Sequence, residues 1–276
     1  MSVDLSAGTA TGEGTDTIVV PAYSGGIVGS AYDDVLTGTD GPDRIDGGAG
    51  DDRIDALGGN DELETGTGED VVRGRGGDDY IMSPDKGRDR LYGDGGEDSV
   101  QGRGPGSAIG GGAGDDYLVS WLGASVHGGP GNDDIVADVI RRRTIEIDGG
   151  DGRRDTVSLR APKSEFPRGS RYVIDVPRKR VTVDGAKRAR YEGIEDTRFS
   201  GRPGSLAYLG GSGRDRLSVS GGMQVTAYGR RGPDILVGGS RSDLLDGGPG
   251  RDAVVGGPGR DRCISAEQRR QCEVRR

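Results

Sequence analysis

Aromatic residues are scarce in this 276-residue sequence: they make up 4% of it, with one tryptophan and two phenylalanines. A wide core depends on the large area that aromatic side chains bury. The scarcity therefore argues against an ordinary globule and favours a thin core of aliphatic side chains. It also argues against an enzyme that holds a polysaccharide in a long cleft lined by aromatic platforms.

Histidine is nearly absent as well, since His127 is the single one. It lies near Trp121 in an irregular stretch, where we interpret it as filling a degenerate repeat. The motifs G-x-S-x-G, H-E-x-x-H and G-x-x-x-x-G-K-[ST] do not occur. We therefore predict that the chain is not an enzyme, with a carbohydrate-acting β-helix that uses paired carboxylates as the alternative.

The two cysteines, Cys263 and Cys272, both lie near the C-terminus. A zinc site is disfavoured because no second pair of cysteines or histidines lies nearby. We interpret the two cysteines as a disulfide that closes the tail onto the last repeat, which implies an oxidising compartment. Two free buried thiols are the alternative.

Long apolar stretches are missing too, so the sequence contains no membrane span. Residues 1–20 lack the basic region followed by an apolar region that marks a signal peptide. Residues 2–18 look like a spacer that recurs around residues 181–196. We therefore expect the chain to be a piece of a longer protein.

Charge is divided unevenly along the chain, although the net charge is only −9. Residues 1–136 contain 27 acids and 8 bases, whereas residues 137–276 contain 19 acids and 29 bases. The first half is suited to holding cations, and the second half is suited to a different partner.

Glycine is abundant, with 56 residues, and it recurs in a nine-residue pattern typified by residues 47–55, Gly-Gly-Ala-Gly-Asp-Asp-Arg-Ile-Asp. The sixth place of the pattern is held first by Asp34, Asp43, Asp52, Asp61, Asp70, Asp79, Asp89, Asp98, Asp116 and Asp133, with serines at 107 and 125. The eighth place is held by Leu36, Ile45, Ile54, Leu63, Val72, Ile81, Leu91, Val100, Ile109, Leu118 and Ile135. Such a period predicts a solenoid in which each repeat adds one aliphatic side chain to a continuous stack.

The nonapeptide resembles the G-G-x-G-x-D-x-U-x repeat of the repeats-in-toxin (RTX), or hemolysin-type calcium-binding, family. The resemblance implies an all-β fold, a right-handed parallel β-roll, in a secreted bacterial protein. Each repeat supplies one turn and one strand, so two repeats should form one coil, with repeats n and n+2 on the same side. Without calcium we expect the acidic, glycine-rich chain to be disordered.

Stacking of alternate repeats places aspartates in rows, such as Asp34, Asp52 and Asp70. Carboxylates in a row repel one another unless a cation lies among them, and Ca²⁺ accepts six to eight oxygens in flexible geometry. The resemblance assigns the sixth-place aspartates and loop carbonyls as calcium ligands. The family preference for Asp or Asn at the fifth place is met by Asp33, Asp51, Asn60, Asp78, Asp115 and Asn132. For any single aspartate, an Asx turn is the alternative, and no EF-hand loop is present.

The register is lost over residues 137–200. We expect residues 141–147 to form one alternating strand, and residues 171–176 and 180–184 to form a β-hairpin. The basic run here could bind an acidic polymer, a surface polysaccharide rather than nucleic acid. A solvated basic face is the alternative.

A second array has sixth-place residues Asp215, Asp234, Asp243, Asp252 and Asp261, and core residues Leu217, Leu236, Leu245, Val254 and Cys263. It departs from the family pattern at the fifth place, which holds Arg214, Pro233, Arg251 and Arg260. These arginines could weaken calcium binding or replace the ion as a counter-charge.

The expected segments are a cap or spacer over 1–28, the first calcium-binding array over 29–136, a basic spacer with a hairpin over 137–200, an arginine-rich array over 201–264, and a cap tail over 265–276 that contains a short helix over 265–273. The predicted function is binding of several Ca²⁺ ions with calcium-dependent folding of an extracellular module. The alternative is a structural or adhesive surface that binds acidic polymer or matrix and needs little calcium.

Overall fold

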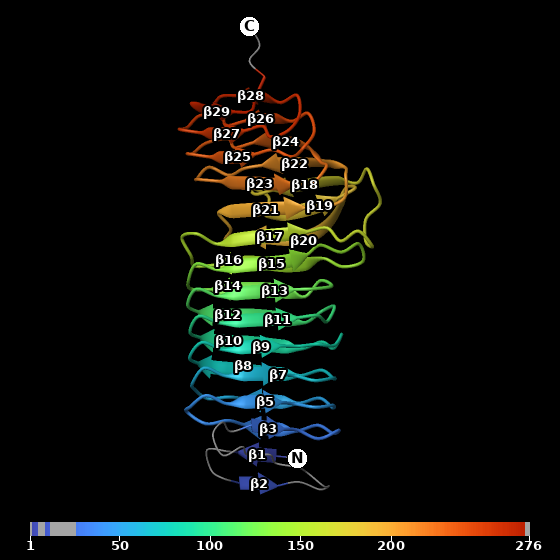
Figure 1. The fold of residues 1–276 in the computed structure, drawn as a ribbon, viewed down its shortest axis with the longest axis vertical. Coiled ribbons are helices and arrows are strands. Elements are labelled where there is room, and N and C mark those ends of the chain that lie inside the picture. Colours follow the sequence, from blue (N-terminus) through green and yellow to red (C-terminus); the bar gives the residue numbers. More distant parts are fainter. Residues whose placement is uncertain (1, 5–8, 12–25, 274–276) are drawn as a thin grey trace. The chain divides into compact units, whose positions relative to one another are not determined.

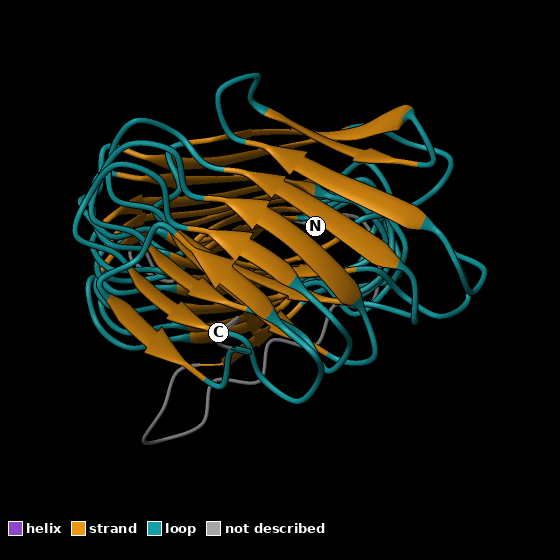
Figure 2. Ribbon diagram, turned by 90° about the horizontal axis from the view of Figure 1, so that it is seen from above, coloured by secondary structure: helices purple, strands orange, loops and turns teal. Residues whose placement is uncertain are grey.

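The computed structural model describes residues 2–4, 9–11 and 26–273. These residues form strands, turns and loops, with no helix among them (Figure 2). The run 17–20, which belongs to the expected N-terminal cap, lies outside the described residues. The chain divides into unit 1, Met1–Ile135 with Gly149–Gly152, and unit 2, Val136–Asp148 with Arg153–Arg276.

Unit 1 is a stack of short strands in two sheets (Figure 1). The first sheet has the order β2 (Thr9–Thr11), β1 (Ser2–Asp4), β4 (Val35–Thr37), β6 (Arg53–Asp55), β8 (Val71–Gly76), β10 (Arg90–Gly95), β12 (Ala108–Ala113) and β14 (Ser125–Gly129). The second has the order β3 (Gly26–Val28), β5 (Arg44–Asp46), β7 (Glu62–Glu64), β9 (Tyr80–Met82), β11 (Ser99–Gly102) and β13 (Tyr117–Ser120). Apart from the antiparallel pair β1–β2, the paired strands within these sheets are parallel.

Two repeats form one coil. Val35 of β4 lies opposite Arg53 of β6, and Arg44 of β5 lies opposite Glu62 of β7, so strands 18 residues apart are neighbours in the same sheet. Successive repeats therefore alternate between the two sheets. This parallel β-solenoid confirms the predicted fold class.

The core is a stack of eighth-place aliphatics. The middle residue is buried in the three-residue strands β3 to β7 and in β9, and Leu36 and Val72 are completely buried. Their neighbours along the strand point outward, as strand geometry requires. Burial of one such side chain stabilises the fold by about 1.5–3 kcal/mol, so repetition of a single position builds most of the core of unit 1.

Unit 2 repeats this arrangement around an irregular insertion. Its first sheet runs β16 (Ile145–Gly150), β20 (Ala186–Glu192), β19 (Arg180–Val183), β18 (Arg171–Asp175), β22 (Ser205–Leu209), β24 (Gln224–Tyr228), β26 (Leu244–Asp246) and β28 (Arg262–Ile264). Its second runs β29 (Gln268–Arg270), β27 (Ala253–Val255), β25 (Ile235–Val237), β23 (Arg216–Ser220), β21 (Asp196–Ser200) and β17 (Thr156–Arg160). The boundary between the two units falls within β15 (Asp134–Asp138) and within β16.

The predicted hairpin is present as β18 and β19, which pair antiparallel. β20 pairs antiparallel with β19 and parallel with β16, so the insertion is a three-stranded meander built into the sheet. One expectation is wrong: residues 141–143 form a turn and loop, and the strand begins only at Ile145. Three consecutive exposed arginines offer no inward-facing apolar side chain, so they do not extend the strand.

Aromatic side chains fill the coil around the meander. Phe166, Tyr172, Tyr191, Phe199 and Tyr208 are each at most 2% exposed. The rings of Tyr172 and Phe199 lie 5.0 Å apart, and those of Phe166 and Tyr172 lie 5.9 Å apart edge to face. The aromatics of the basic spacer are therefore core residues and offer no stacking surface to a polymer.

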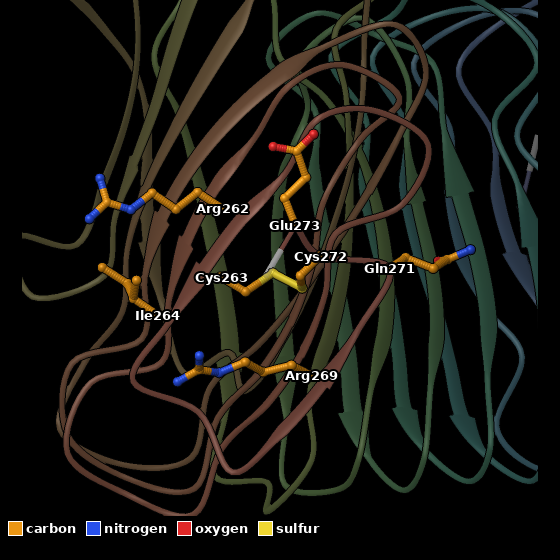
Figure 3. A pocket seen from close by; sticks show the side chains of 7 residues that line it. All are labelled: Arg262, Cys263, Ile264, Arg269, Gln271, Cys272 and Glu273. Carbon is orange, nitrogen blue, oxygen red and sulfur yellow. A yellow bond between two sulfur atoms is a disulfide. The ribbon is translucent and has the colours of Figure 1, made fainter. Parts of the chain in front are cut away.

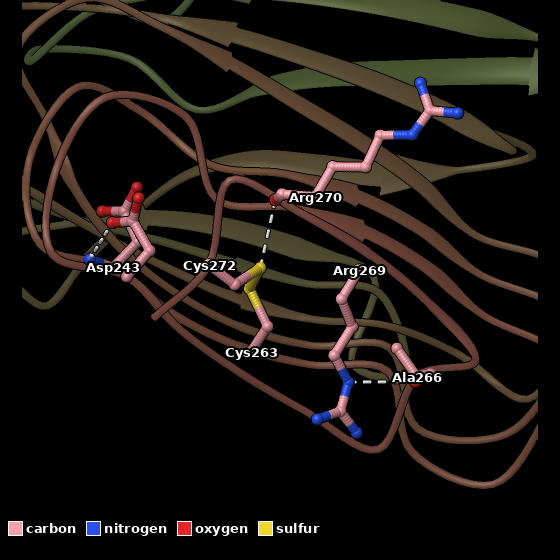
Figure 4. The surroundings of a disulfide bond; sticks show 7 residues. Asp243, Cys263, Ala266, Arg269, Arg270 and Cys272 are labelled. Atoms are coloured by element: carbon pink, nitrogen blue, oxygen red, sulfur yellow. Dashed lines mark hydrogen bonds between the residues drawn. A yellow bond between two sulfur atoms is a disulfide. The ribbon is translucent and has the colours of Figure 1, made fainter. Parts of the chain in front are cut away.

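The C-terminal end is closed by a disulfide between Cys263 and Cys272, as predicted (Figure 4). The expected helix over 265–273 is wrong, because this segment contains the strand β29, which pairs parallel with β27. The free edge of β27 takes up the backbone of the tail, and these hydrogen bonds are incompatible with a helix.

Replacing both cysteines by serine (Cys263→Ser, Cys272→Ser) is expected to loosen this cap. The disulfide spans nine residues, and closing a loop of that length stabilises by about 2.5 kcal/mol in the chain-entropy model. Hydrogen exchange should show faster exchange of the amides of β27 and β29. The wild-type chain under a reductant serves as the control and should match the variant, whereas unchanged exchange in both would contradict the assigned role.

Candidate calcium-binding loops

Sixth-place aspartates link successive coils through their Oδ1 atoms. The backbone N–H of Asp34 donates to Asp52 Oδ1, and that of Asp52 donates to Asp70 Oδ1, both at 2.8 Å. On the other edge of unit 1, the N–H of Asp43 donates to Asp61 Oδ1 and that of Asp61 donates to Asp79 Oδ1. The two rows predicted from the sequence are therefore both present.

The same ladder extends through both arrays. In the first array, the N–H groups of Asp70, Asp79, Asp98 and Asp116 donate to the Oδ1 atoms of Asp89, Asp98, Asp116 and Asp133, respectively. In the second array the N–H groups of Asp215, Asp234 and Asp243 donate to Asp234, Asp252 and Asp261. At the degenerate place 107, the Ser107 hydroxyl accepts the N–H of Asp89 instead.

The second carboxylate oxygen, Oδ2, is buried and lacks a hydrogen-bond partner among the described residues in nine of these aspartates. They are Asp52, Asp61, Asp70, Asp79, Asp98, Asp116, Asp234, Asp252 and Asp261. Buried anionic oxygens without a partner are costly. Their recurrence at one repeat position indicates that a ligand completes each loop.

These oxygens face backbone carbonyls of the next coil. A Cβ placed on Gly47 would lie 2.7 Å from Asp52 Oδ2 and would clash with the carbonyl of Thr65, one coil further on. The same pair of oxygens surrounds Gly229, namely Asp234 Oδ2 and the Gly247 carbonyl. The space that glycine leaves is thus lined by oxygen atoms, the ligand type that Ca²⁺ prefers.

The backbone conformation of the second residue of each nonapeptide decides whether Oδ2 of the sixth-place aspartate has a partner. In all nine of these loops the second-place residue has a positive φ; these residues are Gly48, Leu57, Gly66, Arg75, Asp94, Gly112, Arg230, Gly248 and Gly257. In two of them the N–H donates outward, from Gly48 to Asp46 and from Gly248 to Asp246. Four of the nine are not glycine, although this conformation is unfavourable for L-residues. We call these nine the open loops.

Four other loops satisfy Oδ2 from within. The second-place N–H donates to it from Ser30 to Asp34, Thr39 to Asp43, Gly211 to Asp215 and Gly239 to Asp243, at 2.5–2.7 Å. None of these second-place residues has a positive φ. The Tyr208 hydroxyl also donates to Asp215 Oδ1, at 3.4 Å. We call these the closed loops, because protein donors already neutralise the carboxylate.

Fifth-place side chains lie on the exposed rim of the loops. Asp33, Asp51, Asn60, Asp78 and Asp115 each accept, through Oδ1, the backbone N–H of the fifth-place residue one coil further on. Asn132 donates its side-chain amide to Asp115. These contacts brace successive loops, and a direct role for these residues as calcium ligands stays a prediction.

The fifth-place arginines of the second array do not replace the ion. Arg214, Arg251 and Arg260 are exposed, and the ion pair of Arg260 is with Glu273, at 3.8 Å. Asp234, Asp252 and Asp261 keep Oδ2 atoms without a partner among residues 26–273. The geometry therefore favours calcium over arginine bridging in this array.

Sequence reasoning missed three members of the ladder. Asp155 is fully buried and its N–H donates to Glu195 Oε2 at 2.8 Å, while the N–H of Asp252 donates to Glu267 Oε2 at 2.6 Å. Glu195, which follows the meander, and Glu267, in the C-terminal tail, thus accept the N–H that an aspartate accepts elsewhere in the ladder. Residues 149–157 are recognisable in the sequence as a repeat stretched by one residue, but the spacing does not assign Asp155 to the rows of ligands.

Burial sets the acidity of the sixth-place carboxyls. Loss of hydration, together with the charge of neighbouring carboxylates in the row, raises the pKa of Asp52, Asp79, Asp116 and Asp234 to about 7. Burial likewise raises the pKa of Asp61, Asp70 and Asp98 to about 6, although the backbone N–H bonds oppose the shift. A nearby cation would favour the charged form of each group.

Other candidate sites offer less. No group of three or more His, Cys, Asp or Glu side chains that could hold a metal occurs among the described residues. An open pocket of about 300 Å³ beside the disulfide is lined by Arg262, Cys263, Ile264, Arg269, Gln271, Cys272 and Glu273 (Figure 3). It contains no nucleophile with an adjacent base. In the described part of the chain, no helix is long and apolar enough to cross a membrane.

Comparison with known families identifies the repeats. A model of the RTX calcium-binding nonapeptide repeat matches the chain in four copies, over residues 28–63, 55–83, 85–104 and 228–263. Comparison with curated proteins finds no match. The matched family is a structural calcium-binding module, not a family of enzymes. Over these matched stretches the chain contains RTX calcium-binding nonapeptide repeats, which confirms the resemblance seen in its sequence.

Proposed function

We propose that this chain is a calcium-binding module whose folding depends on the ions held by its open loops. The observation that carries the proposal is the set of nine buried Oδ2 atoms, each without a partner in the described structure and placed at the same position of the repeat. Calcium would supply the positive charge that these oxygens lack. Its tolerance for many oxygens in flexible geometry suits loops of carbonyls and single carboxylates better than the strict octahedron of magnesium does.

The open loops divide between the two units. Six sixth-place aspartates of unit 1 belong to them, together with Asp234, Asp252 and Asp261 of unit 2. Calcium binding is therefore proposed for both arrays. The closed loops of Asp34, Asp43, Asp215 and Asp243 are proposed to fold without a bound ion, because a backbone N–H within each loop already donates to Oδ2.

Folding coupled to calcium suits a protein that acts outside the cell. The chain would stay unfolded where calcium is scarce and fold where calcium reaches the millimolar range in which extracellular modules bind it. The disulfide of the C-terminal cap supports an oxidising compartment. We propose an extracellular location on these grounds.

Neighbouring aspartates offer a sharp test, because Asp79 belongs to an open loop and Asp78 lies on its rim. Asp79→Asn removes the carboxylate charge at the proposed ion and is expected to lower the number of bound Ca²⁺ ions, or to weaken one site about tenfold. Asp78→Asn removes the same charge one residue away but keeps an oxygen for the N–H of Glu97. Its ion count should equal that of the wild type in equilibrium dialysis with metal analysis.

A closed loop provides the second control. Asp43→Asn keeps an oxygen for the N–H of Thr39, so the closed loop survives and the ion count is expected not to change. Equal loss of calcium in the variants of Asp43, Asp78 and Asp79 would contradict the division into open and closed loops. No loss in the Asp79 variant would contradict the site itself.

A further inference from the structure

Exposed arginines gather along one edge of the second array. The loops 210–215, 229–234 and 247–252 lead from strands of one sheet of unit 2 to β23, β25 and β27 of the other, and β25 pairs in register with both β23 and β27. We define the basic edge as Arg214, Arg230, Arg231 and Arg251, all of them exposed.

The ladder of hydrogen bonds fixes the spacing of this edge. Asp215, Asp234 and Asp252 follow one another through N–H to Oδ1 bonds of 2.8 Å, so Arg214 and Arg251 hold the same place two coils apart. Strands that neighbour one another in a sheet lie about 4.8 Å apart. The four guanidinium groups therefore rise from a strip of backbone about 10 Å long.

These arginines differ in their contacts from the cations around the meander that pair with acids. Arg160 pairs with Asp138 at 2.8 Å and Arg178 with Asp175 at 3.0 Å, so much of the positive charge around the meander is neutralised within the fold. Within the described residues, no arginine of the basic edge forms an ion pair. Arg230 acts on the buried Asp215 and Arg251 on Glu267 only through their longer-range charge.

We propose that the basic edge binds an extended anionic polysaccharide with regularly spaced carboxylate or sulfate groups. Arginine presents a planar fork of donors that matches such groups, and a row of forks at the coil spacing suits a linear chain that lies along the strip. Tyr228 ends β24 beside Arg230 and is 37% exposed, so its ring is available to one sugar.

The chemistry of the edge favours a polysaccharide over a single-stranded nucleic acid. Nucleic acids of this kind are held by a row of aromatic side chains on which successive bases stack. The three loops consist of glycine, serine, arginine, proline and aspartate; of the two tyrosines next to them, Tyr208 is buried and Tyr228 is exposed. The disulfide supports an oxidising compartment, where anionic polysaccharides occur at cell surfaces and in matrices.

The test compares two variants of equal charge in calcium buffer, with ion content and circular dichroism checked for both. The edge variant carries Arg214→Gln, Arg230→Gln, Arg231→Gln and Arg251→Gln. The control variant carries Arg53→Gln, Arg88→Gln, Arg90→Gln and Arg168→Gln, four exposed arginines that do not belong to the basic edge. Binding is measured by calorimetry with a heparin-derived decasaccharide, with an uncharged dextran oligomer as the neutral probe and a single-stranded DNA 20-mer as the alternative polyanion.

The edge variant should bind the decasaccharide about tenfold or more weakly than the wild type, as four exposed ion pairs imply, and the control variant should lose much less. Wild-type affinity should fall with salt, and dextran should not bind. Unchanged affinity in the edge variant, or equal losses in both variants, would overturn the proposal. Tighter binding of the DNA 20-mer than of the decasaccharide would also overturn it, by assigning the edge to nucleic acid.

Discussion

Removal of calcium with a chelator at pH 7.5 is expected to abolish the β-sheet circular dichroism of this chain and its cooperative thermal transition. Each site held at 100 times its dissociation constant contributes about 2.7 kcal/mol of stability when only the folded state binds. Three such sites already match the whole stability of a typical domain, about 5–15 kcal/mol. The structure has nine open loops, so the ions are expected to decide whether the chain folds.

The physical reason lies in the buried Oδ2 atoms. Asp52 and Asp70 lie on consecutive coils, each with one oxygen on the backbone ladder and the other without a partner in the described structure. Without the ion, folding must bury these charges beside one another. Returning calcium should restore the spectrum, whereas an equal concentration of magnesium should not. A calcium-free chain that keeps its full spectrum at pH 7.5 would refute the proposed coupling.

Lowering the pH is expected to stabilise the calcium-free fold. In that fold the pKa of Asp52, Asp79, Asp116 and Asp234 is about 7, against an ordinary value of 3.8. The folded state thus binds more protons than the unfolded state between about pH 4 and pH 7, so its stability rises as the pH falls through this window. Each carboxyl contributes on the order of 1 kcal/mol per pH unit. Circular dichroism of the chelator-treated chain, followed from pH 7.5 to pH 5, measures the effect as a gain of β-sheet signal.

Neutral amides should reproduce the effect of acid. The variant with Asp52→Asn, Asp79→Asn, Asp116→Asn and Asp234→Asn removes four buried charges, so at pH 7.5 without calcium it should be more stable than the wild type. Its stability should also depend less on pH, and it should bind fewer calcium ions. The wild type with calcium is the control: its affinity for the ion should fall at pH 5, because protons compete for the same oxygens. A calcium-free wild type that gains no β-sheet signal on acidification would contradict the assigned pKa values.

Much of the repeat architecture can be predicted from the sequence, because the strand and the turn of each repeat depend on residues within that repeat. The aliphatic at Leu36, and its equivalent every nine residues, fixes which residue points inward, and the glycines mark the turns. The hairpin around Pro177 was equally visible, because two alternating segments flank a turn. The helix predicted over residues 265–273 is absent, because the backbone of this segment pairs with the free edge of β27. That edge is a feature of the tertiary structure.

The candidate site was only partly predictable. Sequence spacing gave the rows of Asp34, Asp52 and Asp70, yet it assigned the same role to every aspartate of the pattern. The structure separates Asp43, which is closed by Thr39, from Asp61, whose second-place residue Leu57 has a φ of 74°. A glycine at that place is no guide either, because Gly48 lies in an open loop and Gly239 in a closed one.

The sequence by itself determined the nine-residue period, the aliphatic stack and the rows of aspartates, because these depend on strand alternation and on residues that recur at a fixed step. Only the tertiary structure decided which carboxylates keep an oxygen without a partner, where Glu195 and Glu267 replace aspartate, and which arginines stay outside ion pairs. Each of these depends on the orientation of a peptide group or side chain against the next coil. Residues about 18 positions away in the chain set that orientation, so no local pattern contains it.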